Sequence, residues 1–170
     1  MIKRRTWSFT AICIGLLLLV TLQTGCMKIV RNADKDRPSS SISGEELLIR
    51  LERTACFGKC PVYSLMIKGD GTVIYSGVDF VQTRGIQETT IPIADVNELV
   101  LEFEKADYFS LDDSYTKFGK SDMPSVYTSI TLGGISKSVE HYLGDLTAPK
   151  ELTELEDKID EIVNSDQWIK

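Results

Sequence analysis

The chain has 170 residues, a length that suits one globular domain together with a short export segment. Its hydrophobic and charged fractions, 42% and 26%, are those of an ordinary globular protein. The formal net charge of −6 disfavours nucleic-acid binding, because such a surface repels phosphate backbones, and it argues against docking on anionic lipid through a basic patch.

Residues 1–25 have the pattern of a lipoprotein signal peptide. Three basic residues near the start precede an apolar run over 7–22, which falls short of the about 20 apolar residues that a spanning helix needs. The end, Leu22-Gln-Thr-Gly25 before Cys26, resembles a bacterial lipobox, although Gln23 stands where an aliphatic residue is usual. We predict cleavage before Cys26 and acylation of its thiol with palmitate or similar chains. The alternatives are a membrane-spanning helix and ordinary cleavage that leaves an odd thiol.

Residues 26–44 are predicted to form the lipidated cysteine and a flexible tether. This stretch contains charges and serines and has little to bury. A flexible coil of this length has a root-mean-square span of roughly 25 Å. Met27 rather than Asp follows the lipidated position, which by analogy with Gram-negative sorting favours the outer membrane, facing the periplasm. The single folded domain is then 45–170.

The first half of that domain is predicted to contain four strands: 45–53, 62–68, 72–76 and 82–91. Alternating apolar residues mark the first two, and β-branched and aromatic residues mark the third. Between the second and third, Gly69-Asp-Gly71 tolerates the positive φ of a tight hairpin turn. Gly77 indicates a break or bulge, and Gly85 makes the fourth strand irregular.

Cys56 and Cys60 flank three residues in the connection between the first two strands. Given the export signal, a structural disulfide is the favoured interpretation, with a chain-entropy contribution of roughly 2 kcal/mol. A redox-active pair is the first alternative, although thioredoxin-type sites use a two-residue spacing. A zinc site would need two further soft ligands, and free thiols are the last alternative.

The motif Arg53-Thr-Ala-Cys-Phe-Gly-Lys-Cys-Pro-Val-Tyr63, followed by Gly69-Asp-Gly-Thr-Val73, resembles the bacterial domain of unknown function family 6438. Asp122-Met-Pro124 and Gly134-Ile-Ser-Lys-Ser-Val139 also look like that family, so the resemblance spans roughly residues 45 to 168. It implies an exported bacterial protein, often a lipoprotein. It implies no activity and no catalytic residue.

The second half is predicted to contain a helix, a hairpin and a last helix: 94–109, 125–132 with 135–143, and a segment starting at Pro149. Apolar residues recur at helical spacing in both helices, and the outer face of the last one is acidic. Trp168 is expected to cap the core. The predicted fold class is α+β, a mostly antiparallel sheet of five or six strands with two amphipathic helices covering one face, in the order ββββαββα.

The polar loop 111–124 is the candidate binding loop, through Asp112, Asp113 and Asp122. Calcium needs six or more oxygens at defined spacing, and no EF-hand pattern is present, so the alternative is that these aspartates cap turns. His141 lies in a predicted strand, where a lone histidine is more often structural than catalytic. No nucleophile elbow or phosphate-binding glycine loop occurs. We therefore predict no catalytic residue, no bound metal and no cofactor.

These observations predict a membrane-tethered envelope lipoprotein that acts as a non-catalytic binding or assembly module. Its partners would be the membrane, through the lipid on Cys26, and an unidentified envelope protein or small ligand. The open face of the antiparallel sheet, or the acidic loop beside it, is the candidate binding surface. Two alternatives are a thiol-redox protein using Cys56 and Cys60 and a metal-dependent enzyme using the loop from Asp112 to Asp122.

Overall fold

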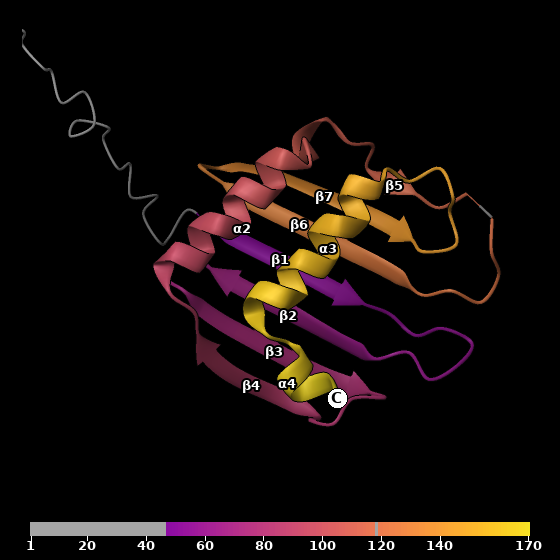
Figure 1. Cartoon of the computed structure of the whole chain (residues 1–170), viewed down its shortest axis with the longest axis horizontal. Helices are drawn as coiled ribbons and strands as arrows, with labels where there is room; N and C mark the ends of the chain where they lie inside the picture. Colours follow the sequence, from indigo (N-terminus) through magenta and orange to yellow (C-terminus); the bar gives the residue numbers. More distant parts are fainter. Residues whose placement is uncertain (1–46, 118) are drawn as a thin grey trace, which may run out of the picture. The chain divides into compact units, whose positions relative to one another are not determined.

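The computed structural model describes residues 47–117 and 119–170. The predictions for the signal peptide, for Cys26 and for the tether lie outside these residues. The described part is a two-layer α+β domain, in which helices pack on one face of a single sheet (Figure 1).

The sheet has seven strands in the order β4-β3-β2-β1-β6-β7-β5. All neighbouring pairs are antiparallel except β5 and β7, which run parallel. β1 is the central strand, because it pairs with β2 on one side and with β6 on the other. The strand bounds are β1 Leu48–Arg53, β2 Val62–Lys68, β3 Thr72–Asp79, β4 Gly85–Thr90, β5 Ser114–Tyr115, β6 Ser125–Leu132 and β7 Ile135–Tyr142.

The predicted fold class and element order are confirmed, with a strand count of seven rather than five or six. The additional strand is β5, which lies inside the segment predicted to be a polar loop. Its two residues pair with Glu140 and His141 of β7. Two residues are too few to show an alternating pattern, so only the tertiary pairing reveals this strand.

The helices are α2 (Ile93–Lys105), the 3-10 turn η1 (Tyr108–Ser110), α3 (Lys150–Val163) and the short α4 (Asp166–Ile169). The first helix ends earlier than the predicted residue 109, because Asp107 adopts a left-handed conformation with φ of 47°. Pro149 precedes α3 as its N-cap rather than occupying its first position. Among the described residues, no helix is both long enough and apolar enough to cross a membrane.

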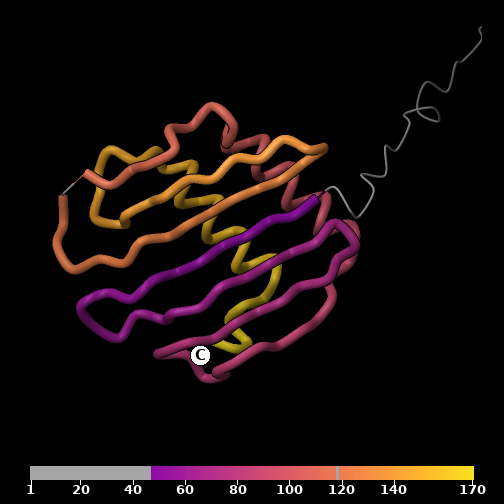
Figure 2. The backbone as a smooth tube through the Cα atoms, turned by 180° about the vertical axis from the view of Figure 1, so that it is seen from behind, coloured from indigo at the N-terminus to yellow at the C-terminus, as the bar shows by residue number. Residues whose placement is uncertain are grey.

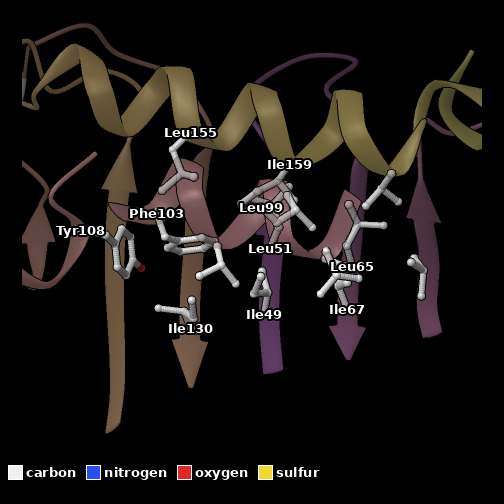
Figure 3. Packing of buried hydrophobic residues seen from close by; sticks show 14 of the residues in the cluster. Ile49, Leu51, Leu65, Ile67, Leu99, Phe103, Tyr108, Ile130, Leu155 and Ile159 are labelled. Carbon is white, nitrogen blue, oxygen red and sulfur yellow. The ribbon is translucent and has the colours of Figure 1, made fainter. Parts of the chain in front are cut away.

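The central strands turn alternate side chains toward the helices. In β1, Ile49 and Leu51 are fully buried, whereas Arg50 and Glu52 are exposed on the other face. This alternation is the pattern that the sequence predicts. Figure 3 shows the resulting apolar layer between the strands and the two longer helices: Ile49, Leu51, Leu65, Ile67, Leu99, Phe103, Tyr108, Ile130, Leu155 and Ile159.

A bulge ends the pairing of β2 with β3. Tyr63 pairs with Gly77 and Val62 with Asp79, so one residue of β3 is skipped, at the glycine where the sequence predicts a break. A Cβ at Gly77 would lie 2.2 Å from the carbonyl oxygen of Thr83, which explains why glycine is needed there. The strand therefore continues past the bulge to Asp79 instead of ending at residue 76.

Within the described residues, the core includes a buried polar contact between His141 of β7 and Glu156 of α3. Nδ1 of the histidine lies 3.0 Å from Oε2 of the glutamate, and their side chains are 3% and 1% exposed. Burial raises the pKa of Glu156 above its ordinary value, and the charge and hydrogen bond of His141 act in the opposite direction. The pair holds the middle of α3 against β7.

No described helix or strand covers the face of the sheet opposite the helices (Figure 2). Its side chains are of mixed character: Arg50 and Glu52 on β1, Ser64 and Met66 on β2, and Tyr127 on β6. The expectation that both helices cover one face is confirmed.

Candidate functional site

A polar cluster at one end of the sheet is centred on Asp160 of α3. Its carboxylate accepts hydrogen bonds from Nε of Arg53 at 2.9 Å, from the hydroxyl of Tyr63 at 2.7 Å and from the hydroxyl of Ser165 at 2.6 Å. The terminal nitrogen of Arg53 also reaches Asp157, at 3.2 Å. One carboxylate thus joins the last residue of β1, the second residue of β2 and the connection between α3 and α4.

Local structure explains why these side chains meet. Arg53 and Tyr63 are directly paired across β1 and β2, so they lie side by side at the edge of the ladder. Asp160 lies on the last turn of α3, and Asn164 then adopts a left-handed conformation with φ of 55° that ends the helix. The backbone N–H of Ser165 donates to the carbonyl oxygen of Asp160, which brings the serine hydroxyl back toward the carboxylate.

The charges in this cluster stabilise one another. Burial by itself lowers the pKa of Arg53, but the negative charge of Asp160 and its hydrogen bond outweigh that effect, so the guanidinium stays charged. Burial and the same carboxylate raise the pKa of Tyr63 well above its ordinary value. Its hydroxyl therefore stays protonated and acts as a donor. The cluster thus combines a charged guanidinium and a protonated hydroxyl, both held on the carboxylate of Asp160.

A cleft of about 470 Å³ lies over this cluster. Its walls come from the end of the disulfide loop, from the last turns of α3 and from α4. Three of its carboxylates, those of Asp157, Glu161 and Asp166, are 60–71% exposed. The lining residues are Arg53, Pro61, Tyr63, Asp157, Asp160, Glu161, Asn164, Ser165, Asp166 and Ile169.

The cleft has the composition of a binding site for a positively charged group with an aliphatic stem. Carboxylates on its rim form charge-assisted hydrogen bonds with an ammonium or guanidinium group. Pro61 and Ile169 add apolar surface against which the stem of such a group can pack. Asp160 accepts three hydrogen bonds from the protein, whereas Asp157 and Glu161 each make one ion pair, with Arg53 and with Lys158, and are 71% and 70% exposed. Asp157 and Glu161 are therefore the candidate carboxylates for contact with a ligand.

The disulfide loop adjoins this cleft. Cys56 and Cys60 form a disulfide bond, with their Cα atoms 5.7 Å apart. The bridge closes the connection that starts after Arg53 and ends before Tyr63, so it holds the two strand ends together next to the cluster. Phe57, inside the bridged loop, is 90% exposed.

The three predicted loop aspartates do not gather around one point. Asp113 pairs with Nζ of Lys137, and the backbone N–H of Asp112 binds the hydroxyl of Tyr115. Asp122 adopts φ of 66°, and its backbone carbonyl accepts from Phe57. Across residues 47–117 and 119–170, no group of three His, Cys, Asp or Glu side chains could hold a metal ion.

The most informative residues of this region were not predicted from the sequence. The sequence pattern places Tyr63 at the end of the cysteine motif and acidic residues on the outer face of the last helix, without assigning either to a site. Asp160 falls beside the apolar stripe of that helix, one residue after Ile159, and this position was the available signal. The sequence showed no partner for it, because Arg53 precedes it by 107 residues.

Comparison with known protein families matches residues 47–163 to a family described as a domain of unknown function (DUF6438). The match covers the sheet, both long helices and the disulfide loop. No curated protein matches this chain.

Replacing Asp160 with Asn should destabilise the domain by about 2–3 kcal/mol, because the half-buried guanidinium of Arg53 loses its main counter-charge. Urea unfolding followed by circular dichroism measures this change.

The matched control for that experiment is Asp166→Asn, at a cleft carboxylate that is 60% exposed and pairs with Lys170. It should cost no more than about 0.5 kcal/mol. Equal effects of the two substitutions would show that Asp160 does not anchor α3 to the sheet.

Proposed function

Because the chain belongs to the DUF6438 family through residues 47–163, and that description names no activity, we propose a function from the chain's own residues. The protein is a membrane-tethered lipoprotein of the bacterial envelope, and its folded domain is a non-catalytic binding or assembly module. The signal pattern before Cys26 and the polar stretch that follows support the tether. Met27 after the lipidated position supports a location in the outer membrane, with the domain facing the periplasm.

The observation that carries the binding role is the cleft over Asp160. A binding site works best when its groups are held in place before the ligand arrives, because less ordering then opposes association. Here Arg53, Tyr63 and Ser165 are all fixed on one carboxylate. The adjacent disulfide limits the motion of the strand ends that carry two of them.

The same groups do not support a catalytic role. A general base needs a pKa near the working pH and a free lone pair directed at the substrate. The oxygens of Asp160 already accept three hydrogen bonds, and Tyr63 is held in its protonated form. The ligand proposed for the cleft is a cationic side chain or amine that the rim carboxylates hold without chemical change.

The tether is tested on full-length protein purified from bacterial membranes. Intact mass should show a chain that begins at Cys26 and carries acyl groups, and Cys26→Ser should remove the acyl mass and release the protein from membranes. Alkylation without reductant should add nothing, since Cys56 and Cys60 are paired. A chain that retains residues 1–25 would contradict the lipoprotein assignment.

The cleft is tested with acetyl-arginine amide as the probe and uncharged acetyl-citrulline amide as its control. In the mature chain carrying Cys26→Ser, the arginine probe should shift the amide resonances of Asn164 and Ser165. Asp157→Asn with Glu161→Gln should strongly reduce the shifts, because two of the three exposed rim carboxylates are lost.

A matched variant for the cleft experiment is Glu151→Gln with Glu154→Gln, which neutralises exposed acids near the start of the same helix. It should leave the shifts intact. Equal shifts from the citrulline probe would refute a cation site.

Thiol-disulfide exchange is a second candidate function, favoured by the position of the disulfide in a loop whose middle is exposed. The purified protein would then reduce or oxidise a test disulfide, and Cys60→Ser would abolish the reaction. A bridge in the folded protein that neither dithiothreitol nor a dithiol peptide reduces would exclude this candidate.

A further inference from the structure

Exposed apolar side chains gather on three loops at one end of the sheet. Phe57 in loop 54–61 is 90% exposed, Leu146 in loop 143–149 is 71% exposed and Met123 in loop 119–124 is 38% exposed. These three segments, the end loops, follow β1 and β7 and precede β6. Both ribbon views place them along the same edge of the domain (Figures 1 and 2).

Hydrogen bonds join the end loops into one surface. The backbone N–H of Phe57 donates to the carbonyl oxygen of Asp122, at 3.3 Å. The N–H of Lys120 donates to the carbonyl oxygen of Gly144 at 2.8 Å, and the hydroxyl of Tyr142 donates to the carbonyl oxygen of Lys120 at 2.7 Å. The three apolar tips are therefore presented together.

The surface is also stiff. The Cys56–Cys60 bridge constrains the loop that carries Phe57. Asp145, which is buried, accepts from the N–H and hydroxyl of Thr147 and from the N–H of Lys117. Such bracing limits the conformations that the end loops can adopt.

Lysines accompany the apolar tips. Lys59, Lys117 and Lys120 are exposed, and within the described residues none of them forms an ion pair. By contrast, all four lysines of α2, α3, α4 and their flanks pair with carboxylates: Lys105, Lys150, Lys158 and Lys170. The end loops themselves carry Lys59, Lys120, Asp122 and the buried Asp145, whose charges sum to zero. Lys117, two residues before loop 119–124, brings the local charge to +1, whereas the net charge of the chain is negative.

We propose that the end loops form a membrane-contact surface, which inserts Phe57, Met123 and Leu146 among the headgroups of an anionic phospholipid bilayer. Proteins bind the surface of anionic bilayers through apolar side chains with cationic side chains beside them. The apolar groups enter the boundary of the acyl chains, and the cations contact lipid phosphates. A bilayer fits better than a hydrophobic protein partner, since unpaired lysines are depleted at protein–protein interfaces.

The chain that precedes the described domain is long enough for this orientation. β1 begins at the sheet end opposite to loop 54–61, so a tether has to pass the length of the domain, about 27 Å for an eight-residue strand. Residues 27–46 span up to about 65 Å when extended. The inference rests on the proposed envelope location, but it does not require acylation of Cys26.

The test uses the full mature chain reconstituted in vesicles of phosphatidylcholine and phosphatidylglycerol with brominated acyl chains. Phe57→Trp should be quenched by bromine at least about twofold more than Ile135→Trp, a site that is 65% exposed on the hairpin at the opposite end of the sheet. Trp168 is common to both variants and buried, so it cancels from the comparison.

Lysine replacement tests the charge component. Each of Lys59→Gln, Lys117→Gln and Lys120→Gln should weaken the docked state by about fivefold, and omission of phosphatidylglycerol should act in the same direction. Equal quenching at the two tryptophan sites, or none at residue 57, would overturn the proposal. Intact mass of the same sample reports acylation at Cys26 separately, so failure of the lipid anchor and failure of the docking surface are distinguishable.

Discussion

The burial of one face of the sheet under α2 and α3 is the constraint on which the rest of the structure depends. β1 lies at the centre of that sheet, and its side chains Ile49 and Leu51 are fully buried. Each such aliphatic side chain contributes about 1.5–3 kcal/mol when it is removed from water. Because helices cover only one face, the loops and strand ends at the edges are where polar groups can be arranged for binding.

The polar cluster at Asp160 forms where the end of α3 lies over the ends of β1 and β2. A half-buried ion pair is weak evidence for stability, because desolvation offsets much of the attraction between the charges. Its value here is geometric, since it fixes the end of α3 over the paired residues Arg53 and Tyr63. The disulfide begins three residues beyond Arg53 and ends three residues before Tyr63. The covalent and ionic constraints therefore act on the same strand ends.

Charge is distributed unevenly over the domain. Exposed carboxylates line the cleft on α3 and α4, whereas the lysines of the end loops have no acidic partner among the described residues. Net charge is a sum over the surface and hides this separation. The acidic cleft and the lysines beside the exposed apolar tips therefore lie at the same end of the sheet.

Local sequence patterns were sufficient for most of the fold. The hairpin around Gly69-Asp-Gly71, the strands on either side of Gly133-Gly134 and the two amphipathic helices follow from alternation, turn chemistry and helical spacing, all of which act between near neighbours. The family resemblance came from the motif around Cys56 and Cys60, and the match over residues 47–163 confirms it.

Tertiary structure decided the features that depend on distant residues. The sequence alone determined the α+β class of the domain and the cysteine pair in the connection between its first two strands. Three contacts could not be predicted from the sequence, because they form only when separate elements pack together. They are the contacts of Asp160 with Arg53, of Glu156 with His141, and of Phe57 with the loop at Asp122. β5 could not be predicted for the same reason, since its two residues form a strand only by pairing with β7.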